Sequence, residues 1–283
     1  MTPILAGTTI AAVMQRAPVA QLEARMLIGH VTQLTRVHLI THSERALSAA
    51  EAEQLSSLFQ RRVAGEPMAY LLGEREFFGL TFQVDPDVLI PRPDTELLVE
   101  LALQHLPQHG RVLDMGTGSG AIAIAIAHTR RDAHVTALDV SESALLVAQK
   151  NAKNNQVEVE FLRSDWFTAV AEQLAEQQFD LIVSNPPYIV AGDRHLSEGD
   201  LRFEPIDALT DHSDGLSALR IISQQAADYL SDDGWLLMEH GYDQAEAVRD
   251  LLTKNKFTEV QSWCDLANIE RVSGGKKSRA GSQ

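Results

Sequence analysis

The segment Asn185-Pro186-Pro187-Tyr188 places an amide and an aromatic ring directly after a short apolar run, Phe179–Ser184. Neither proline can donate a hydrogen bond to a sheet, so we expect the run to end there as a strand and continue as a stiff loop. Ligands of open α/β sheets bind at the carboxyl ends of the strands. An amide that donates and accepts hydrogen bonds, beside an aromatic face, suits a planar nitrogen substrate. The alternative interpretation is a proline-rich turn with a capping Asn.

A second motif, in residues 111–120, is a glycine-rich turn between an apolar strand and an apolar helix. Gly116, Gly118 and Gly120 let the backbone turn tightly and approach a ligand without a Cβ in the way. The pattern is typical of a nucleotide-type cofactor site at a strand–helix junction, although a glycine fingerprint alone is weak evidence.

The acid before the glycine-rich turn helps to decide which cofactor the turn binds. Gly116, Gly118 and Ala121 fit the dinucleotide pattern G-x-G-x-x-G/A, so NAD is one possibility. Asp114, at the strand end, would repel a pyrophosphate. A carboxylate there suits an amine-bearing ligand instead, such as the amino-acid portion of S-adenosylmethionine, which we therefore expect as the cofactor.

Two further strand ends carry residues suited to a nucleoside. Asp139 ends the apolar run His134–Val140, at the offset of about 20 residues after the glycines that is typical of a ribose-binding acid. Its alternative role is to cap the next helix. Trp166 follows a third predicted strand, Val157–Arg163, where it could cover an adenine ring or belong to the core.

The order of these motifs resembles the class I S-adenosylmethionine-dependent methyltransferases that act on planar amide or amine nitrogens. Over nearly its whole length the chain most closely resembles the bacterial release factor glutamine methyltransferases. Further segments that carry this resemblance are Gly65–Pro67, Pro91–Glu96, Phe203–Pro205 and Asn268–Val272. The sequence Pro-Arg-Pro-Asp-Thr-Glu at Pro91–Glu96 separates this family from the related methyltransferases of a ribosomal protein glutamine, which carry a different segment there.

The resemblance implies a reaction and a set of site residues. The methyl group of S-adenosylmethionine would pass to the side-chain amide nitrogen (N5) of the glutamine in a Gly-Gly-Gln motif of release factors, leaving S-adenosylhomocysteine. The implied catalytic residues are Asn185, Pro186 and Tyr188. The implied cofactor-binding residues are Asp114, Gly116, Thr117, Gly118, Ser119, Gly120, Asp139, Trp166 and Asn185. The implied substrate-binding residues are Asn185, Pro186, Pro187, Tyr188, Glu204 and Pro205.

The elements that must position these residues follow from periodicity. Residues 1–75 read as helices, with a capping box at Ser48 and Glu51 and a helix end at Gly65. Residues 76–90 alternate and predict a linking β-hairpin. From residue 91 to 283, strands and helices alternate, which predicts a Rossmann-like α/β sheet.

The end of the chain carries its own expectations. The later predicted strands are Trp235–His240, Glu259–Cys264 and Ile269–Ser273. The last two are so close in sequence that we expect them to pair antiparallel. Residues 274–283 read as a disordered tail. The resemblance implies that residues 1–75 recognise the substrate, whereas periodicity alone indicates a small helical bundle.

Composition limits the remaining possibilities. No apolar run approaches the roughly 20 residues of a membrane span, and the amino terminus has no signal-peptide pattern. The single cysteine excludes an internal disulfide and fits a cytoplasmic protein. The histidines form no metal-binding pattern, so we expect no metal.

The charge distribution favours a protein substrate. Residues 1–90 hold 7 basic and 9 acidic residues, and residues 91–283 hold 17 and 30. An acidic catalytic half is poorly suited to a phosphate backbone but would attract a basic protein, although acidity also simply aids solubility. We expect release factors as partners, no stable nucleic-acid or membrane binding, and a monomer. An adenine or guanine methyltransferase of nucleic acids and a non-catalytic S-adenosylmethionine-binding adaptor are the alternatives.

Overall fold

The structure is a computed structural model that describes residues 3–279. The chain divides into two compact units, Met1–Glu74 and Arg75–Gln283. Each unit has its own buried core.

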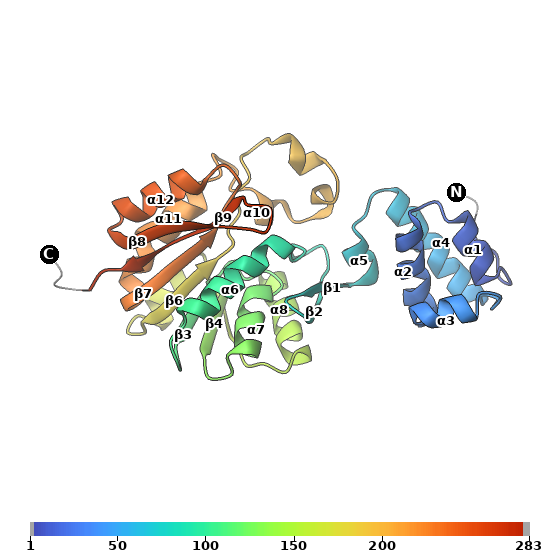
Figure 1. Ribbon diagram of the computed structural model, residues 1–283, viewed down its shortest axis with the longest axis horizontal. Coiled ribbons are helices and arrows are strands. Elements are labelled where there is room, and N and C mark those ends of the chain that lie inside the picture. The colour runs from blue at the N-terminus through green and yellow to red at the C-terminus, as the bar shows by residue number, and fades with distance from the viewer. Residues whose placement is uncertain (1–2, 280–283) are drawn as a thin grey trace. The chain divides into compact units, whose positions relative to one another are not determined.

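The first unit is a bundle of short helices (Figure 1). Its helices are α1 (Ile10–Arg16), α2 (Gln21–Thr32), α3 (Arg36–Thr41), α4 (Ala49–Val63) and α5 (Met68–Leu72). The predicted capping box begins α4, since Glu51 N donates to Ser48 Oγ at 3.2 Å and Ser48 N donates to Glu51 Oε2 at 2.8 Å. Gly65 follows the end of α4 with φ +98°. Leu27, Leu55 and Phe59 lie in the bundle core, as the apolar face of α4 predicts.

The second unit begins with a hairpin of β1 (Glu74–Phe77) and β2 (Leu80–Gln83). Both turn residues, Phe78 and Gly79, have positive φ, as a tight hairpin turn requires. The hairpin is held to the helix Glu142–Asn154, because Gln83 N donates to Asn151 Oδ1 at 2.7 Å and Asn151 Nδ2 donates back to Gln83 O at 2.9 Å.

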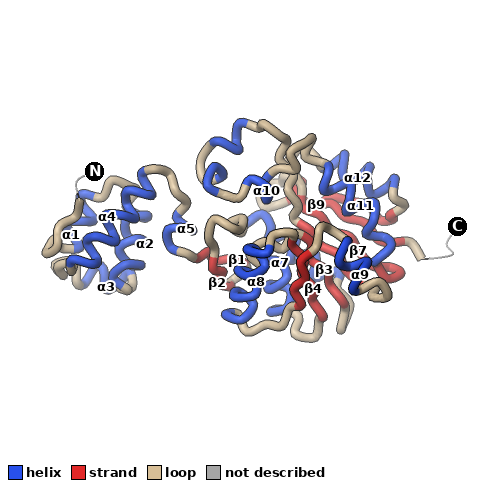
Figure 2. The backbone as a smooth tube through the Cα atoms, turned by 180° about the vertical axis from the view of Figure 1, so that it is seen from behind, coloured by secondary structure: helices blue, strands red, loops and turns tan. Residues whose placement is uncertain are grey.

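A mixed sheet forms the centre of this unit, with seven strands in the described part of the chain (Figure 2). Its strands are β3 (Arg111–Met115), β4 (His134–Asp139), β5 (Glu160–Arg163), β6 (Phe179–Ser184), β7 (Leu230–Glu239), β8 (Phe257–Cys264) and β9 (Glu270–Lys277). The spatial order is β5-β4-β3-β6-β7-β9-β8. The strands from β5 to β7 are parallel, and β9 pairs antiparallel with both β7 and β8. The predicted antiparallel pairing of the last two strands is therefore confirmed.

Helices cover both faces of the sheet (Figures 1 and 2). They are α6 (Glu96–His105), α7 (Ala121–Thr129), α8 (Glu142–Asn154), α9 (Thr168–Gln173), α10 (Ile206–Leu209), α11 (Ser217–Tyr229) and α12 (Ala245–Lys254). Successive residues of β3 point to opposite faces: Val112 packs with α6 and α7, whereas Leu113 packs with α11 and α12. Burial on both faces explains why the parallel strands are apolar throughout. This arrangement confirms the predicted Rossmann-like fold.

The structure differs from the sequence expectation at several strand boundaries. β7 begins at Leu230 instead of Trp235, and β8 begins at Phe257 instead of Glu259. β5 begins at Glu160, so residues 157–159 of the predicted third strand lie outside it. Residues 274–277, predicted as part of a disordered tail, form the second half of β9 and pair with β7 and β8. Gly274 and Gly275 are buried between the flanking strands, where their lack of a side chain is what permits the pairing. Residues 280–283 lie outside the described residues.

Candidate active site

The site lies where the strand order reverses. From β3 the chain moves to β4 and β5 on one side and then returns to β6 and β7 on the other. The carboxyl ends of β3 and β6 are therefore neighbours that carry the glycine turn and the Asn-Pro-Pro-Tyr segment. Ser184 Oγ, on β6, donates to Met115 O, on β3, at 2.7 Å. This bond fixes the two loops relative to each other.

A cavity of about 420 Å³ opens at this point. Its volume is within the range of small-molecule sites. The predicted site residues that line it are Gly116, Gly118, Asp139, Trp166, Asn185, Pro187 and Pro205. Thr117 and Ser119 line a smaller adjoining hollow that Asn185 shares. The predicted residues that line neither space are Asp114, Gly120, Pro186, Tyr188 and Glu204.

The glycine turn forms an open cradle. Gly116 and Gly118 have φ of +73° and +54°, and a Cβ at either position would meet no atom within 4 Å. The space beside them is thus available to a ligand that approaches the backbone closely. Gly120 has a different task, because a Cβ there would lie 2.7 Å from Ile124 Cδ1 and 3.1 Å from Ala148 Cβ. It allows α7 to pack closely on α8.

Asp139 lies at the rim of the cavity and also holds the turn. One carboxylate oxygen accepts from Gly118 N at 2.8 Å, and the other accepts from Ser141 N at 2.9 Å. The helix cap is Ser141, which accepts from Ala144 N, so the capping alternative for Asp139 does not describe this structure. Burial raises the pKa of the Asp139 carboxyl despite these bonds. A ligand hydroxyl that donates to the carboxylate would offset part of that cost.

Asp114 is buried beneath the turn instead of facing the cavity. Its Oδ2 accepts from Thr117 Oγ1 at 2.6 Å and from Ala123 N at 3.3 Å. Its Oδ1 has no hydrogen-bond partner among the described residues. Burial raises the pKa of this carboxyl to about 7. The structure thus shows Asp114 supporting the turn, and Asp114 lines neither the cavity nor the adjoining hollow.

Trp166 combines the two roles considered for it. It lines the cavity, and it also packs against the core on the α11–α12 face of the sheet. Its backbone has φ +46°, a conformation that non-glycine residues rarely adopt. Ser164 holds this turn, since its Oγ donates to Trp166 O at 2.6 Å and accepts from Ala169 N at 2.9 Å.

Asn185 is attached to the Pro91–Glu96 segment. Its Nδ2 donates to Thr95 Oγ1 at 3.2 Å, and Thr95 is buried. Sequence analysis used that segment only to discriminate between families. The structure gives it a physical role, because Thr95 anchors the Asn185 side chain.

Tyr188 turns away from the cavity, toward an acid that sequence analysis missed. Its hydroxyl donates to Glu239 Oε1 at 3.3 Å. Glu239 is the last residue of β7 and is 2% exposed. Burial raises its pKa to about 7. The available signal was a single acid directly after the apolar run Trp235–Met238, which a buried strand does not require.

Glu204 connects two loops instead of lining the cavity. It accepts from Ile90 N at 3.0 Å and forms an ion pair with Arg92. Its carboxylate is fully buried. These contacts hold the loop that carries Pro205 against the segment that carries Thr95, so the structure places Glu204 as an anchor beside the predicted substrate position.

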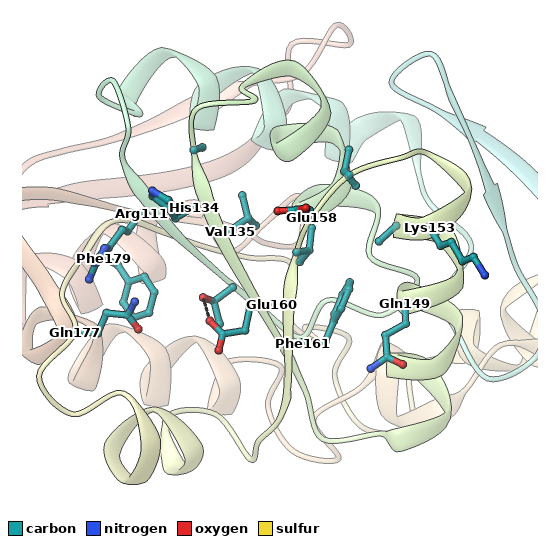
Figure 3. Close-up of a pocket in the computed structure, with 15 residues that line it drawn as sticks. Arg111, His134, Val135, Gln149, Lys153, Glu158, Glu160, Phe161, Gln177 and Phe179 are labelled. Atoms are coloured by element: carbon teal, nitrogen blue, oxygen red, sulfur yellow. Dashed lines mark hydrogen bonds between the residues drawn. The ribbon is translucent and has the colours of Figure 1, made fainter.

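A larger cavity, of about 610 Å³, lies at the amino ends of the strands (Figure 3). Arg111, His134, Gln177 and Phe179 gather on one side of β5, and Phe161 and Lys153 lie on the other. None of the predicted site residues lines it. In residues 3–279 we find no cluster of three or more potential metal ligands, and no helix there is long and apolar enough to cross a membrane.

Solved structures share the fold. A methyltransferase from Pyrococcus furiosus superposes with a TM-score of 0.55 at 19% identity, covering 79% of this chain and 100% of its own. A Thermus thermophilus 16S rRNA N2 G1207 methyltransferase, solved with AdoMet and guanosine, gives a TM-score of 0.52 at 25% identity, covering 72% of this chain and 49% of its own. The likeness to these structures shows the fold of the chain alone.

Two family models match the chain. The methyltransferase small domain matches residues 93–199, and the PrmC N-terminal domain matches residues 8–73. The second match lies within the helical unit. The combination is more specific than either domain, because the methyltransferase domain alone leaves the substrate open.

Curated relatives match over nearly the whole chain. A release factor glutamine methyltransferase of Neisseria gonorrhoeae is 52% identical over 256 residues, 90% of this chain and 93% of its own. One of Burkholderia pseudomallei is 50% identical over 276 residues, 95% of this chain and 96% of its own. Identity of this extent shows that the chain belongs to the release factor glutamine methyltransferase family.

Proposed function

We propose that this protein transfers the methyl group of S-adenosylmethionine to the side-chain amide nitrogen (N5) of the glutamine in the Gly-Gly-Gln motif of peptide chain release factors. The observation that carries the proposal is the Asn185 amide. It lies at the edge of a cavity suited to the cofactor, and its hydrogen bond to Thr95 anchors the side chain there.

The residues around the cavity fit the cofactor. When bound, S-adenosylmethionine supplies a methyl group made electrophilic by its sulfonium. Gly116 and Gly118 leave space for a close approach to the backbone. Asp139 offers carboxylate oxygens for ribose hydroxyls, and Trp166 offers a ring for the adenine. Asp114 acts indirectly, by holding the turn.

The loop after β6 is suited to a primary amide. Asn185 Oδ1 and the Pro186 carbonyl can accept the two amide hydrogens of a glutamine, which orients its nitrogen. An amide nitrogen is a weak nucleophile because its lone pair is shared with the carbonyl. It gains positive charge during attack, so these bonds strengthen in the transition state. Positioning of this kind can contribute up to roughly 7–11 kcal/mol. The proton leaves after transfer, so the site needs no dedicated base.

The charge of the catalytic half suits a protein partner. The acidic catalytic half, with 30 acidic and 17 basic residues in 91–283, favours a basic protein over a phosphate backbone. We infer that the protein works as a monomer, that residues 1–75 recognise the release factor, and that Pro187, Pro205 and Tyr188 shape the space around its glutamine.

A methyl-transfer assay with alternative substrates tests this function. Purified enzyme with labelled S-adenosylmethionine would be offered an intact release factor, ribosomal RNA and duplex DNA separately. We expect label in the release factor only. Transfer to either nucleic acid at a comparable rate would contradict the proposal and favour a nucleic-acid amine methyltransferase.

A further inference from the structure

Gln244 is a buried side chain outside the cavity whose amide makes three hydrogen bonds. Its Oε1 accepts from Gly241 N at 2.8 Å, and its Nε2 donates to Tyr188 O at 3.0 Å and to Gly215 O at 3.3 Å. A backbone N–H can only donate and a carbonyl can only accept, so these partners fix the orientation of the amide. The three bonds, which we call the Gln244 clamp, tie the loop after β7 to the end of the Asn-Pro-Pro-Tyr segment and to the loop before α11.

The Asn-Pro-Pro-Tyr segment depends on contacts at its two ends. Its two prolines have no backbone N–H, so neither can hold its place by donating a hydrogen bond. Before them, Asn185 is anchored through its side chain. After them, the Tyr188 carbonyl is held by Gln244. Because the proline rings lock φ and stiffen the segment, a shift at Tyr188 would carry back to the Pro186 carbonyl.

The same clamp closes the long connection between β6 and α11. Next to it, Ile189 N donates to Leu209 O at 3.0 Å, which brings the beginning of the connection against its later part. Pro205, which lines the cavity, lies between these two residues along the chain. Gln244 binds a carbonyl on each side of the connection, so it holds closed the loop that carries Pro205.

The surroundings of Gly215 show how tightly the clamp is packed. A Cβ at this position would lie 2.5 Å from Tyr188 O and 2.8 Å from Gln244 Nε2. Gly215 also has φ +77°, a conformation that side chains disfavour. A larger residue here would therefore have to push apart the two groups that the Gln244 amide joins.

We propose that Gln244 is a positioning residue for methyl transfer, which acts through Tyr188 to fix the place of the Pro186 carbonyl. The inference rests on the proposed function, since that carbonyl is one of the two acceptors proposed for the substrate amide. A displaced acceptor lowers the rate of the chemical step, because its bond to the substrate is made best in the transition state. Cofactor affinity should change little, because the three side-chain hydrogen bonds of Gln244 go to none of the predicted cofactor-binding residues.

Single-turnover methyl transfer to a Gly-Gly-Gln peptide, at saturating S-adenosylmethionine, provides the kinetic test in the full chain. Gln244→Met keeps the length of the side chain but has no N–H to donate. Its matched control is Asn255→Ala, which also removes a side-chain amide that donates to a backbone carbonyl, Leu251 O at 2.8 Å, but at the other end of α12. Gly215→Ala crowds the clamp directly. Its control is Gly192→Ala, at nearly the same φ of +76°, where a Cβ would meet no atom within 4 Å.

We expect Gln244→Met to lower the single-turnover rate about tenfold, the equivalent of one lost hydrogen bond. Its S-adenosylmethionine affinity, measured by calorimetry, should stay close to that of the parent. Gly215→Ala should lower the rate at least as much, whereas Asn255→Ala and Gly192→Ala should keep the parent rate. Equal rates for Gln244→Met and Asn255→Ala, or for the two glycine variants, would overturn the proposal. So would a loss of S-adenosylmethionine affinity in Gln244→Met as large as its loss of rate, since that would indicate general disorder of the site.

Hydrogen exchange observed by NMR tests the clamp without a substrate. The Ile189 amide donates to Leu209 O beside the clamp, so it should exchange about tenfold faster in Gln244→Met, in which one bond no longer holds the loop closed. In Asn255→Ala it should exchange at the parent rate. If Gln244→Met leaves the exchange of Ile189 unchanged, the positioning role is wrong. If the exchange changes but the parent enzyme does not methylate release factors, Gln244 holds the loop and the proposed function alone is wrong.

Discussion

At the scale of single residues, Asp139 has two tasks that one substitution separates. It accepts from Gly118 N, which shapes the glycine turn, and it offers its carboxylate to the cavity. We predict that Asp139→Ala weakens S-adenosylmethionine binding by about 1.5–3 kcal/mol, as for hydrogen bonds to a charged group. Asp139→Asn, which keeps one acceptor for the turn, should lose less. Isothermal calorimetry measures both, and an unchanged affinity in Asp139→Ala would reduce the residue to a loop support.

Two buried acids should make the stability of the protein depend on pH. The pKa values of Asp114 and Glu239 are raised to about 7. Because the folded state then binds more protons than the unfolded state between about pH 4 and pH 7, unfolding free energy should fall as the pH rises through that range and level off above it. Each group contributes on the order of 3 kcal/mol to this fall.

The corresponding measurement is urea unfolding at about pH 5 and about pH 8. The two carboxyls should contribute less to the unfolding free energy of the ligand-free parent at the higher pH. Asp114→Asn and Glu239→Gln should each reduce the difference in unfolding free energy between the two pH values. A difference that neither substitution changes would show that these carboxyls ionise normally in the folded protein.

At the scale of elements, the end of β9 is packed tightly inside the sheet, between β7 and β8. A Cβ on Gly274 would lie 2.5 Å from Leu237 Cδ2 and 2.6 Å from Leu236 O. We predict that Gly274→Ala destabilises the protein by about 1–3 kcal/mol, the usual cost of overpacking a core. Ser278→Ala is the control, because Ser278 is partly exposed and the hydrogen bond of its hydroxyl to Lys256 O is long at 3.4 Å. Equal denaturation midpoints for the two variants would contradict the packing argument.

The same strand shows why part of the fold escaped prediction. Long apolar runs such as Phe179–Ser184 were identified because burial on both faces leaves a strong signal. Gly274-Gly275-Lys276-Lys277 has no such signal and resembles a tail. Its strand conformation depends on the shape of the neighbouring β7 and β8, which the local sequence does not contain.

The candidate site divides in the same way. Gly116, Asp139 and Asn185 were predictable because each follows an apolar strand at a spacing that fixes its place. Glu239 was missed because a sequence does not show what a buried carboxyl contacts. Asp114, Tyr188 and Glu204 were assigned to ligands by their motifs, whereas packing directs each side chain to a protein partner.

At the scale of the whole molecule, each of the two units has its own core, so we expect the two units to have separate functions. The PrmC N-terminal domain match ends at residue 73, and residues from 75 onward form a unit with its own core. We predict that removing residues 1–73 leaves S-adenosylmethionine affinity nearly unchanged but strongly lowers kcat/KM for an intact release factor. A short Gly-Gly-Gln peptide should be methylated about equally by both forms. If the truncated enzyme methylates the intact factor as efficiently as the full chain, the helical unit is not a recognition domain.

The central claim is that Asn185 directs methyl transfer to one glutamine amide. The most direct measurement is mass spectrometry of a release factor after incubation with S-adenosylmethionine and either the parent enzyme or Asn185→Ala. We predict a single methyl group on the side-chain nitrogen of the Gly-Gly-Gln glutamine with the parent. With Asn185→Ala we predict near-normal S-adenosylmethionine affinity and a rate lowered by about two orders of magnitude, as for a transition-state hydrogen-bond partner. Methylation at another residue, or a parent-like single-turnover rate in Asn185→Ala, would contradict the account.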